Sequence, residues 1–309
     1  MHKDGKLEMQ KKLDGLNVAV IGLGLLGTSL AMAMKSLPVH RLGWTRRGEV
    51  REWALTEKIL EETADNPADI LSRADLVILT LPIPVIIEFV RQHAAEFKPG
   101  SVVTDIGSVK EVIVSSCAPV LKKFGVFFVG SHPMAGTEKS GPEAAFPTLY
   151  DNAEVFVTCD ETTDAEAVKL VEAFWQAIGT TTVRIAPVPH DQLVAHSSHV
   201  SHLLALALTM AVLDCDDKKT LEGRFSGCAT GFRDTSRIAS SSPAMWREII
   251  ENNLPAVLDA MDSFEAYYKK LRAMLEAKDF DQFEAEFARG KALRDSWIRY
   301  KNEKHHCNW

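Results

Sequence analysis

A glycine-rich turn near the start of the chain has the spacing of a dinucleotide-binding loop. Gly22, Gly24 and Gly27 form a GxGxxG pattern between a β-branched run at 16–22 and an apolar helical stretch at 25–37. In that context the first glycine permits a tight turn, the second lets the backbone approach a pyrophosphate, and the third lets helix and strand pack closely. The pattern predicts a dinucleotide cofactor; a glycine turn that binds no ligand is the alternative.

The residues after the turn bear on which dinucleotide would bind. The helix begins near Leu25 and Leu26, where free N–H groups and a partial positive charge face the phosphates. At the end of the next strand an acidic residue would bind the ribose 2′-hydroxyl of NAD. This chain has Thr45, Arg46 and Arg47 there, a hydroxyl and two guanidinium groups that suit the extra phosphate of NADP. The sequence therefore favours NADP over NAD, with a solvated basic loop as the alternative.

Two polar segments follow later strands. Ser108 lies in DIGSVK at 105–110, and His132 lies in GSHPMAGTEKSG at 130–141. Open α/β sheets place their ligands at the carboxyl ends of strands, where both segments are expected. An imidazole can act as a base near neutral pH, although a lone histidine before a proline is more often structural.

Three further histidines recur every third residue, at His196, His199 and His202. Successive steps of three residues drift around a helix, and no carboxylate motif joins these side chains. We therefore predict no metal site.

The segments between the motifs alternate in type, which predicts an α/β domain with a doubly wound, mostly parallel Rossmann-type sheet. Strands are expected at 16–22, 41–44, 76–81, 102–105, 127–130, 155–158 and 182–185. Helices are expected at 25–37, 49–57 and 84–97, and after Ser108.

The pattern changes after Pro187 and Pro189, where helical periodicity replaces the strand signal. We predict an N-terminal tail (1–12), a dinucleotide-binding domain (13–187), an all-helical substrate and dimerisation domain (188–303) and a C-terminal tail (304–309). Helical patterns cover 191–213, 243–275 and 280–300. The apolar run at 203–213 is too short to span a bilayer, and we expect a helix buried on all sides, for example in a dimer interface.

Composition excludes some partners. The 309 residues carry a net charge of -7, so the chain lacks the excess of positive charge that nucleic-acid binding requires. Nucleic acid is therefore not expected as a partner. Five cysteines without CxxC spacing suggest reduced thiols in a cytoplasmic protein. An uncharged stretch at 16–34 follows four lysines, as in a signal peptide, but three glycines interrupt it, so export and membrane insertion are not expected.

Taken together, the motifs resemble those of the prephenate and arogenate (cyclohexadienyl) dehydrogenases of tyrosine biosynthesis. The resemblance runs from about Leu16 to Tyr300 and rests on GLGLLG at 22–27, DIGSVK at 105–110, GSHPMAGTEKSG at 130–141, SHVSH at 198–202 and GFRDTSRIASSSPAMW at 231–246. It implies hydride transfer from a cyclohexadienol to NAD(P)+ while loss of carbon dioxide makes the ring aromatic. The product is 4-hydroxyphenylpyruvate from prephenate, or tyrosine from arogenate.

The resemblance also assigns roles to residues. It implies that His132 accepts the hydroxyl proton and that Ser108 contacts the same hydroxyl and orients the histidine. Arg237 matches the arginine that binds a substrate carboxylate, as a guanidinium can do bidentately. His202 matches the histidine near the substrate side chain, while His199 is expected to be structural.

Further residues match positions around the pocket of that family. Thr137 and Glu138 match residues that line it, and Arg233, Asp234 and Trp246 match positions tied to its closure or to substrate contacts. A buried tryptophan is, however, more often a core residue. The positive charge of Arg233 would repel the ammonium group of arogenate, which favours prephenate, the keto acid, as the substrate. The family's usual proline is replaced by Ser201, so the local helix geometry could differ.

Dimerisation through the helical domain and an active site in the cleft between the domains are implied as well. One alternative is a 3-hydroxyacid dehydrogenase of similar architecture, but the segment at 199–202 offers no catalytic lysine. Another is a dinucleotide sensor without chemistry, which should lack the set of His132, Ser108 and Arg237. The chain leaves no room for an appended regulatory domain, so feedback by tyrosine is expected to act at the active site.

Overall fold

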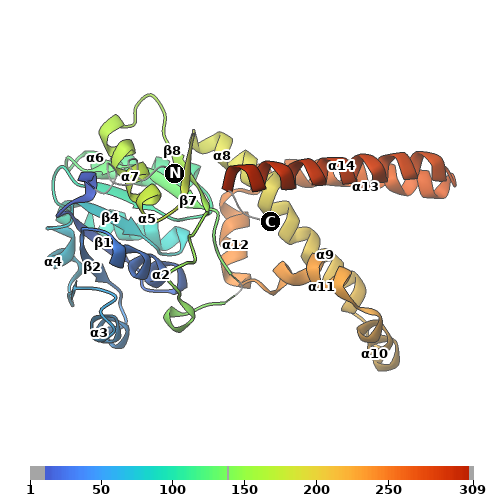
Figure 1. Cartoon of the computed structure of the whole chain (residues 1–309), viewed down its shortest axis with the longest axis horizontal. Helices are drawn as coiled ribbons and strands as arrows, with labels where there is room; N and C mark the ends of the chain where they lie inside the picture. The colour runs from blue at the N-terminus through green and yellow to red at the C-terminus, as the bar shows by residue number, and fades with distance from the viewer. Residues whose placement is uncertain (1–10, 138, 306–309) are drawn as a thin grey trace. The chain divides into compact units, whose positions relative to one another are not determined.

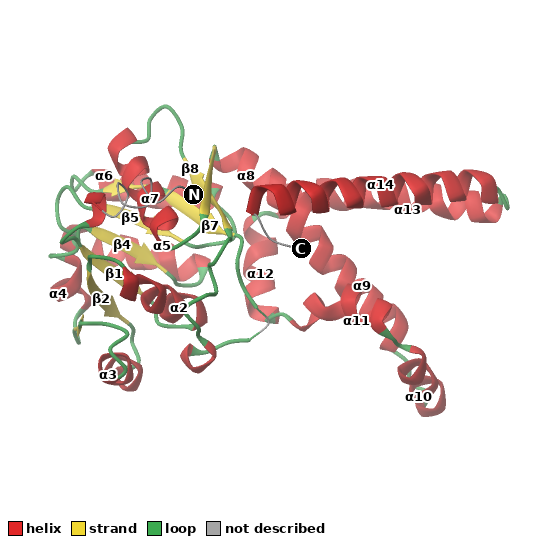
Figure 2. Ribbon diagram, in the orientation of Figure 1, coloured by secondary structure: helices red, strands yellow, loops and turns green. Residues whose placement is uncertain are grey.

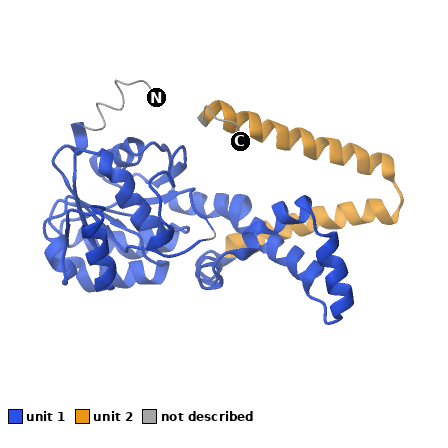
Figure 3. Ribbon diagram, turned by 60° about the horizontal axis from the view of Figure 1, so that its bottom comes forward, with its two compact units in different colours: residues 1–254 blue, residues 255–309 orange. Residues whose placement is uncertain are grey.

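The computed structural model describes residues 11–137 and 139–305 (Figure 1). The chain divides into two compact units, Met1–Leu254 and Pro255–Trp309 (Figure 3). The domain boundary near residue 187 stays a prediction.

A six-stranded parallel sheet forms the centre of the first unit. Its order is β3-β2-β1-β4-β5-β6. The strands are β1 (Asn17–Ile21), β2 (His40–Trp44), β3 (Glu62–Thr63), β4 (Leu76–Leu79), β5 (Val102–Asp105) and β6 (Phe127–Phe128). Strand order reverses beside β1, so the turn that leaves this strand lies at the point where such sheets bind ligands. The Rossmann-type architecture is confirmed; the two-residue β3 was not foreseen.

A second, three-stranded sheet contains the strand that carries His132. It consists of β7 (Gly130–Pro133), β8 (Glu154–Thr158) and β9 (Thr181–Ile185), with β7 and β8 antiparallel. The expectation of a single strand at 127–130 was therefore wrong, and the strands expected at 155–158 and 182–185 belong to this second sheet rather than to the parallel one. The chain passes between sheets at Gly130, where an added Cβ would lie 2.5 Å from Oγ1 of Thr158. Only glycine allows that approach.

Helices pack on both faces of the parallel sheet (Figure 2). They are α2 (Leu25–Ala33), α3 (Gly48–Thr56), α4 (Pro67–Leu71), α5 (Ile83–His93), α6 (Glu111–Lys122) and α7 (Ala165–Ala177). Along β1, Val18 and Val20 join one apolar cluster, and Ala19 and Ile21 join the other. This explains the continuous apolar run, because both faces of the strand are buried. The sequence pattern did not predict α4 and α7.

The rest of the first unit is helical. It contains α8 (Pro187–Val194), a π-helical turn (Ala195–His199), α9 (Val200–Leu213), α10 (Lys218–Gly227), α11 (Thr230–Ser236) and α12 (Pro243–Asn252). Short 3-10 turns cover Met34–Ser36, Ala94–Glu96, Pro142–Ala144 and Arg237–Ser240. The predicted helix at 243–275 is interrupted at Asn253, whose buried side-chain amide bonds to Asp191 on α8 and to His199 in the π-helical turn.

The longest apolar helix differs from its prediction. Pro187–Leu213 is continuous over 27 residues and contains an 18-residue stretch with mean hydropathy 1.2, so by length and composition alone it could cross a membrane. A core helix of a soluble protein passes the same test. The helix is not buried on all sides: Leu206 is 48 % exposed and Met210 is 50 % exposed. The single chain thus leaves part of its apolar surface uncovered.

The second unit is a helical hairpin. Helix α13 (Leu254–Glu276) leads into it, and α14 (Phe280–His305) returns after a turn in which Lys278 has a φ of 55°. Nζ of Lys270 lies 2.6 Å from Oε1 of Glu286, which joins the two helices.

Candidate active site

The glycine-rich turn follows β1, as expected. Gly22 has a φ of 107°, and a Cβ there would lie 2.7 Å from the carbonyl oxygen of Thr80. A Cβ on Gly27 would lie 2.0 Å from the carbonyl oxygen of Gly22. A Cβ on Gly24 would meet nothing within 4 Å. The fold itself therefore requires the outer two glycines, whereas the middle one keeps an open surface over which a ligand can approach the backbone.

The N-terminus of α2 faces the same turn. Thr28 donates its backbone N–H to the carbonyl of Gly24 at 2.9 Å, so the N–H groups of Leu25, Leu26 and Gly27 precede the first helical hydrogen bond. The first turn of this helix contains no acidic residue. These residues fit a pyrophosphate group, because aligned N–H groups and the helix dipole attract an anion.

A basic group lies at the end of β2. Thr45 is buried, while Arg46 and Arg47 are exposed. The guanidinium of Arg47 donates to the carbonyl of Leu23 at 3.3 Å, which places it against the glycine-rich turn. Arg51 donates to the carbonyl of Thr45 at 2.7 Å. Arg46 and Arg47 thus place positive charge at the end of β2, beside the glycine-rich turn, while the charge of Arg51 is paired with Asp65.

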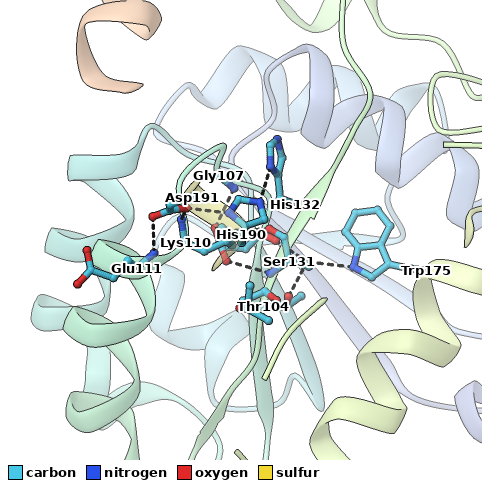
Figure 4. Close-up of polar contacts among 12 residues, drawn as sticks. Thr104, Gly107, Lys110, Glu111, Ser131, His132, Trp175, His190 and Asp191 are labelled. Carbon is cyan, nitrogen blue, oxygen red and sulfur yellow. Dashed lines mark hydrogen bonds and ion pairs between the residues drawn. The ribbon is translucent and has the colours of Figure 1, made fainter. Parts of the chain in front are cut away.

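His132 lies on β7 and is only 7 % exposed. Its Nδ1 lies 2.9 Å from Nε2 of His190, and Nδ1 of His190 lies 2.7 Å from Oδ1 of Asp191 (Figure 4). His190 and Asp191 could not be predicted from the sequence. Their adjacency in a helix gave no signal, because His132 is 58 residues from His190, and Lys110 and Glu111 are 81 and 80 residues from Asp191.

The surroundings of His132 favour its neutral form. Burial lowers its pKa well below 6.5, and the neighbouring His190, Lys110 and His199 lower it further. At neutral pH the ring is therefore unprotonated and can accept a proton. Its pKa lies further from neutrality than the residue type alone suggested.

A buried polar clamp holds the strand that carries His132. Lys110 is fully buried, forms an ion pair with Asp105, and donates to the carbonyl of Ser131 at 2.8 Å. The hydroxyl of Ser131 donates to the carbonyl of Asp105 at 2.6 Å and accepts from the indole N–H of Trp175 at 3.0 Å. These bonds join β7 to the end of β5 and fix the position of the neighbouring histidine.

We expect Lys110→Met to reduce the free energy of unfolding by about 3–5 kcal/mol, because it leaves the buried carboxylate of Asp105 without its counter-ion. Denaturant unfolding followed by circular dichroism measures the change. Lys169→Met is the matched control, since Lys169 forms an exposed ion pair with Glu166 and should matter little. A loss of less than 1 kcal/mol in Lys110→Met would mean that the clamp does not stabilise the fold.

A second group of aromatic and imidazole rings lies on the π-helical turn, α9 and α12. The ring centroids of His202 and Trp246 are 3.9 Å apart, and Nδ1 of His202 lies 3.0 Å from the carbonyl of Ser198. Burial lowers the pKa of His202; the bond to Ser198 opposes this change, and the charge of Arg237 adds to it. His202 is therefore a neutral ring with its Nδ1 hydrogen already donated.

Asn253 connects the two histidine groups. Its side-chain nitrogen lies 2.9 Å from the carbonyl oxygen of Asp191 and 3.2 Å from Nδ1 of His199. The ring of His199 in turn contacts Trp246, with centroids 5.8 Å apart. Contacts thus run without interruption from Asp191, which pairs with His190, to Trp246, against which His202 packs.

The two predicted substrate arginines line one open hollow. Arg233 and Arg237 share it with Phe232 and Ser236. Nε of Arg233 lies 2.9 Å from Oδ1 of Asp234, so a carboxylate offsets its charge. The expected repulsion of a substrate ammonium by Arg233 is weakened accordingly.

The remaining predicted site residues are not part of the hydrogen-bonded groups described above. Ser108 is half-buried in the turn after β5, and its side chain makes no hydrogen bond within residues 11–137 and 139–305. Thr137 is exposed and accepts the N–H of Lys139 at 3.2 Å. Glu138 lies outside the described residues. Ser201 is exposed in the first turn of α9, directly after the π-helical turn.

The three histidines spaced by three residues have different surroundings. His196 is exposed, His199 is buried and His202 is half-buried. Burial lowers the pKa of His199 to about 4, which fits its expected structural role. The absence of a metal site stays a prediction.

Comparison with known families matches nearly the whole chain. The model of the prephenate dehydrogenase nucleotide-binding domain matches residues 36–184, and the model of its dimerization domain matches residues 186–289. Cyclohexadienyl dehydrogenase of Zymomonas mobilis is 33 % identical over 281 residues, which are 90 % of this chain and 94 % of that protein. Prephenate dehydrogenase of Bacillus subtilis is 33 % identical over 283 residues, 90 % of this chain and 75 % of that protein.

Solved structures of prephenate and arogenate dehydrogenases superpose on this chain. Prephenate dehydrogenase from Aquifex aeolicus, in complex with hydroxyphenyl propionate and NAD+, superposes with a TM-score of 0.84 at 29 % identity, covering 92 % of this chain and 99 % of that one. Synechocystis arogenate dehydrogenase gives 0.80 at 26 % identity, covering 91 % and 99 %. A 3-hydroxyisobutyrate dehydrogenase from Salmonella typhimurium gives 0.51 at 14 % identity, covering 80 % and 87 %, a likeness of fold alone.

Proposed function

Since the chain belongs to the prephenate dehydrogenase family, we propose that it oxidatively decarboxylates a cyclohexadienol, prephenate or arogenate, with a nicotinamide dinucleotide. The observation that carries the proposal is His132, a buried and unprotonated base in the same compact unit as the glycine-rich turn. Neither alternative, a 3-hydroxyacid dehydrogenase or a sensor without chemistry, is favoured by any contact among the residues that the structure describes.

The proposed mechanism assigns one task to each group. A nicotinamide dinucleotide held by the glycine-rich turn would supply the acceptor for the hydride of the carbinol carbon. His132 takes the proton of the hydroxyl group through Nε2, and Ser108 contacts the same oxygen. Arg237 holds a substrate carboxylate, while the neutral His202 lies near the side chain. Loss of carbon dioxide supplies the electron pair that makes the ring aromatic, so this step needs no further catalytic group.

For the cofactor we infer a preference for NADP. The support is the hydroxyl of Thr45 and the guanidinium groups of Arg46 and Arg47, with Arg47 in contact with the glycine-rich turn at Leu23. Guanidinium groups bind phosphate oxygens through paired, charge-assisted hydrogen bonds, and no acidic side chain stands among these three residues to receive a ribose 2′-hydroxyl.

Steady-state assays with both substrates and both cofactors test the activity and this preference together. Arg46→Ala combined with Arg47→Ala should raise KM for NADP roughly 10- to 150-fold and leave KM for NAD nearly unchanged, since charge-assisted bonds contribute about 1.5–3 kcal/mol. Arg73→Ala, which removes an exposed arginine paired with Glu62, is the control. Equal rates with NAD and NADP in the unaltered protein would contradict the proposed preference.

Between the two substrates we favour prephenate, whose side chain is a keto acid. The charge of Arg233 supports this choice, although its pairing with Asp234 reduces the effect on an ammonium group. The same assay decides the matter, because arogenate turnover at a higher kcat/KM would reverse the assignment.

We further propose a homodimer assembled through the helical region. A dimerization-domain model matches residues 186–289, and α9 exposes Leu206 and Met210. Light scattering should give about twice the mass of one chain, and a monomeric mass would contradict the proposal.

We also propose a cytoplasmic location. The four cysteines of the described residues are free thiols, which supports it.

A further inference from the structure

A line of three side chains ends at the proposed base. Asp191 contacts His190, and His190 contacts His132, at 2.7 and 2.9 Å (Figure 4). His190 is fully buried, and its ring meets that of Phe156 edge-on with centroids 5.4 Å apart. Phe156 is also the cross-strand partner of His132. Packing therefore fixes the orientation of the middle ring.

The hydrogen-bond partners of Asp191 determine where the protons lie. Its Oδ1 accepts the backbone N–H of Lys110 at 2.7 Å, and its Oδ2 accepts that of Glu111 at 2.9 Å. Both oxygens thus face donors at the start of α6, as a carboxylate requires. His190 must then donate its Nδ1 hydrogen to Asp191. In a neutral ring this leaves Nε2 of His190 as an acceptor.

The same reasoning extends to His132. Because Nε2 of His190 accepts, Nδ1 of His132 must donate, and Nε2 of His132 keeps its lone pair. Burial lowers the pKa of both rings, so both are neutral at neutral pH.

The charged and titratable groups around His190 come from several elements. They are Asp191 on α8, Lys110 and Asp105 at the end of β5 and the turn after it, His132 on β7 and His199 in the π-helical turn. The two carboxylates favour a protonated His190, and the lysine opposes it.

We propose that His190, anchored by Asp191, is a positioning residue that holds His132 in the Nδ1–H tautomer, with Nε2 free to receive the substrate's hydroxyl proton. The proposal rests on the proposed dehydrogenase function. As the O–H bond breaks, its proton forms a bond to Nε2 and its electron pair forms the C–O π bond, while the C–H bond breaks and its electron pair leaves with the hydride. His132 becomes an imidazolium whose Nδ1–H remains bonded to His190, and the carboxylate of Asp191 stabilises the new charge.

Two variants separate positioning from packing. His190→Phe keeps a buried ring but removes the acceptor, whereas His190→Gln offers a carbonyl oxygen near the former Nε2. We expect kcat to fall roughly 100-fold or more in His190→Phe, as is typical when a base is held in the wrong tautomer, with little change in substrate KM. His190→Gln should recover most of the loss. His93→Gln, at a half-buried histidine paired with Glu96, is the matched control.

Ring-nitrogen NMR of histidine-labelled protein reads the tautomer without any turnover. The His132 signals, assigned with His132→Asn, should show a protonated Nδ1 and a bare Nε2 in the wild type and in His190→Gln, and a mixture in His190→Phe. A protonated Nε2 in the wild type, or an unchanged tautomer and kcat in His190→Phe, would overturn the proposal. If His190→Phe fails to fold, the spectra of the wild type and of His190→Gln still show which tautomer His132 adopts. If the wild type turns over neither substrate, the proposed function fails while the tautomer result still stands.

Discussion

Replacing His132 with alanine should lower kcat about 10²- to 10⁴-fold, the usual contribution of a positioned general base. The residue is buried on β7, the strand that the clamp of Lys110 and Ser131 joins to the end of β5. Dinucleotide affinity should stay near that of the wild type, because the glycine-rich turn lies at the end of another strand, β1. Steady-state kinetics and calorimetric titration with the dinucleotide measure the two effects.

The pH profile gives a second measure of the role of His132. Protonation would remove its acceptor, so kcat/KM should fall on the acid side. Because burial lowers the pKa of the ring well below 6.5, the fall should begin only below that pH. Any residual activity of His132→Ala should lack this limb. His93→Ala is the control, and retained turnover in His132→Ala would remove the assigned role.

Arg237→Ala should reduce kcat/KM roughly 10- to 150-fold, which corresponds to the 1.5–3 kcal/mol of a hydrogen bond to a charged group. The loss should appear mainly in substrate KM, since the guanidinium binds a carboxylate that is present before the reaction. Arg237→Lys should recover only part of it, because an ammonium cannot form the paired bonds of the planar group.

Arg247→Ala is the matched control for this effect. Arg247 lies on α12 with its side chain 78 % exposed, and it pairs with Glu251 one turn away. Its loss should leave the kinetics unchanged. A value of kcat/KM within twofold of the wild type in Arg237→Ala would exclude this residue from substrate binding.

Local patterns predicted most elements of the parallel sheet. The strand at 102–105 was placed to the residue, and the glycine-rich turn stands where strand and helix patterns met. The short helix α4 was missed because its five residues contain too few turns for periodicity to show. The passage from one sheet to the other at Gly130 was missed because it depends on the approach of Thr158, a contact distant in sequence.

The residues of the candidate site also differ in whether the sequence alone could reveal them. His132 and Arg237 stood within motifs and could be named from the sequence. His190, Asp191 and Asn253 could not, because each acquires its partners only when the chain folds: His190 from β7, Asp191 from the start of α6, and Asn253 from α8 and the π-helical turn. No spacing rule relates residues 58 or 62 positions apart.

The π-helical turn at Ala195–His199 sets the angular phase of a single long helix. Each residue advances an α-helix by about 100°, so one residue gained or lost within the turn would rotate everything that follows it. Upstream of the turn lie His190 and Asp191; downstream lie His202 and the exposed face of α9. An insertion or deletion here would therefore alter the proposed chemistry and the proposed assembly in one step, and the length of this segment should tolerate less drift over evolution than its individual side chains.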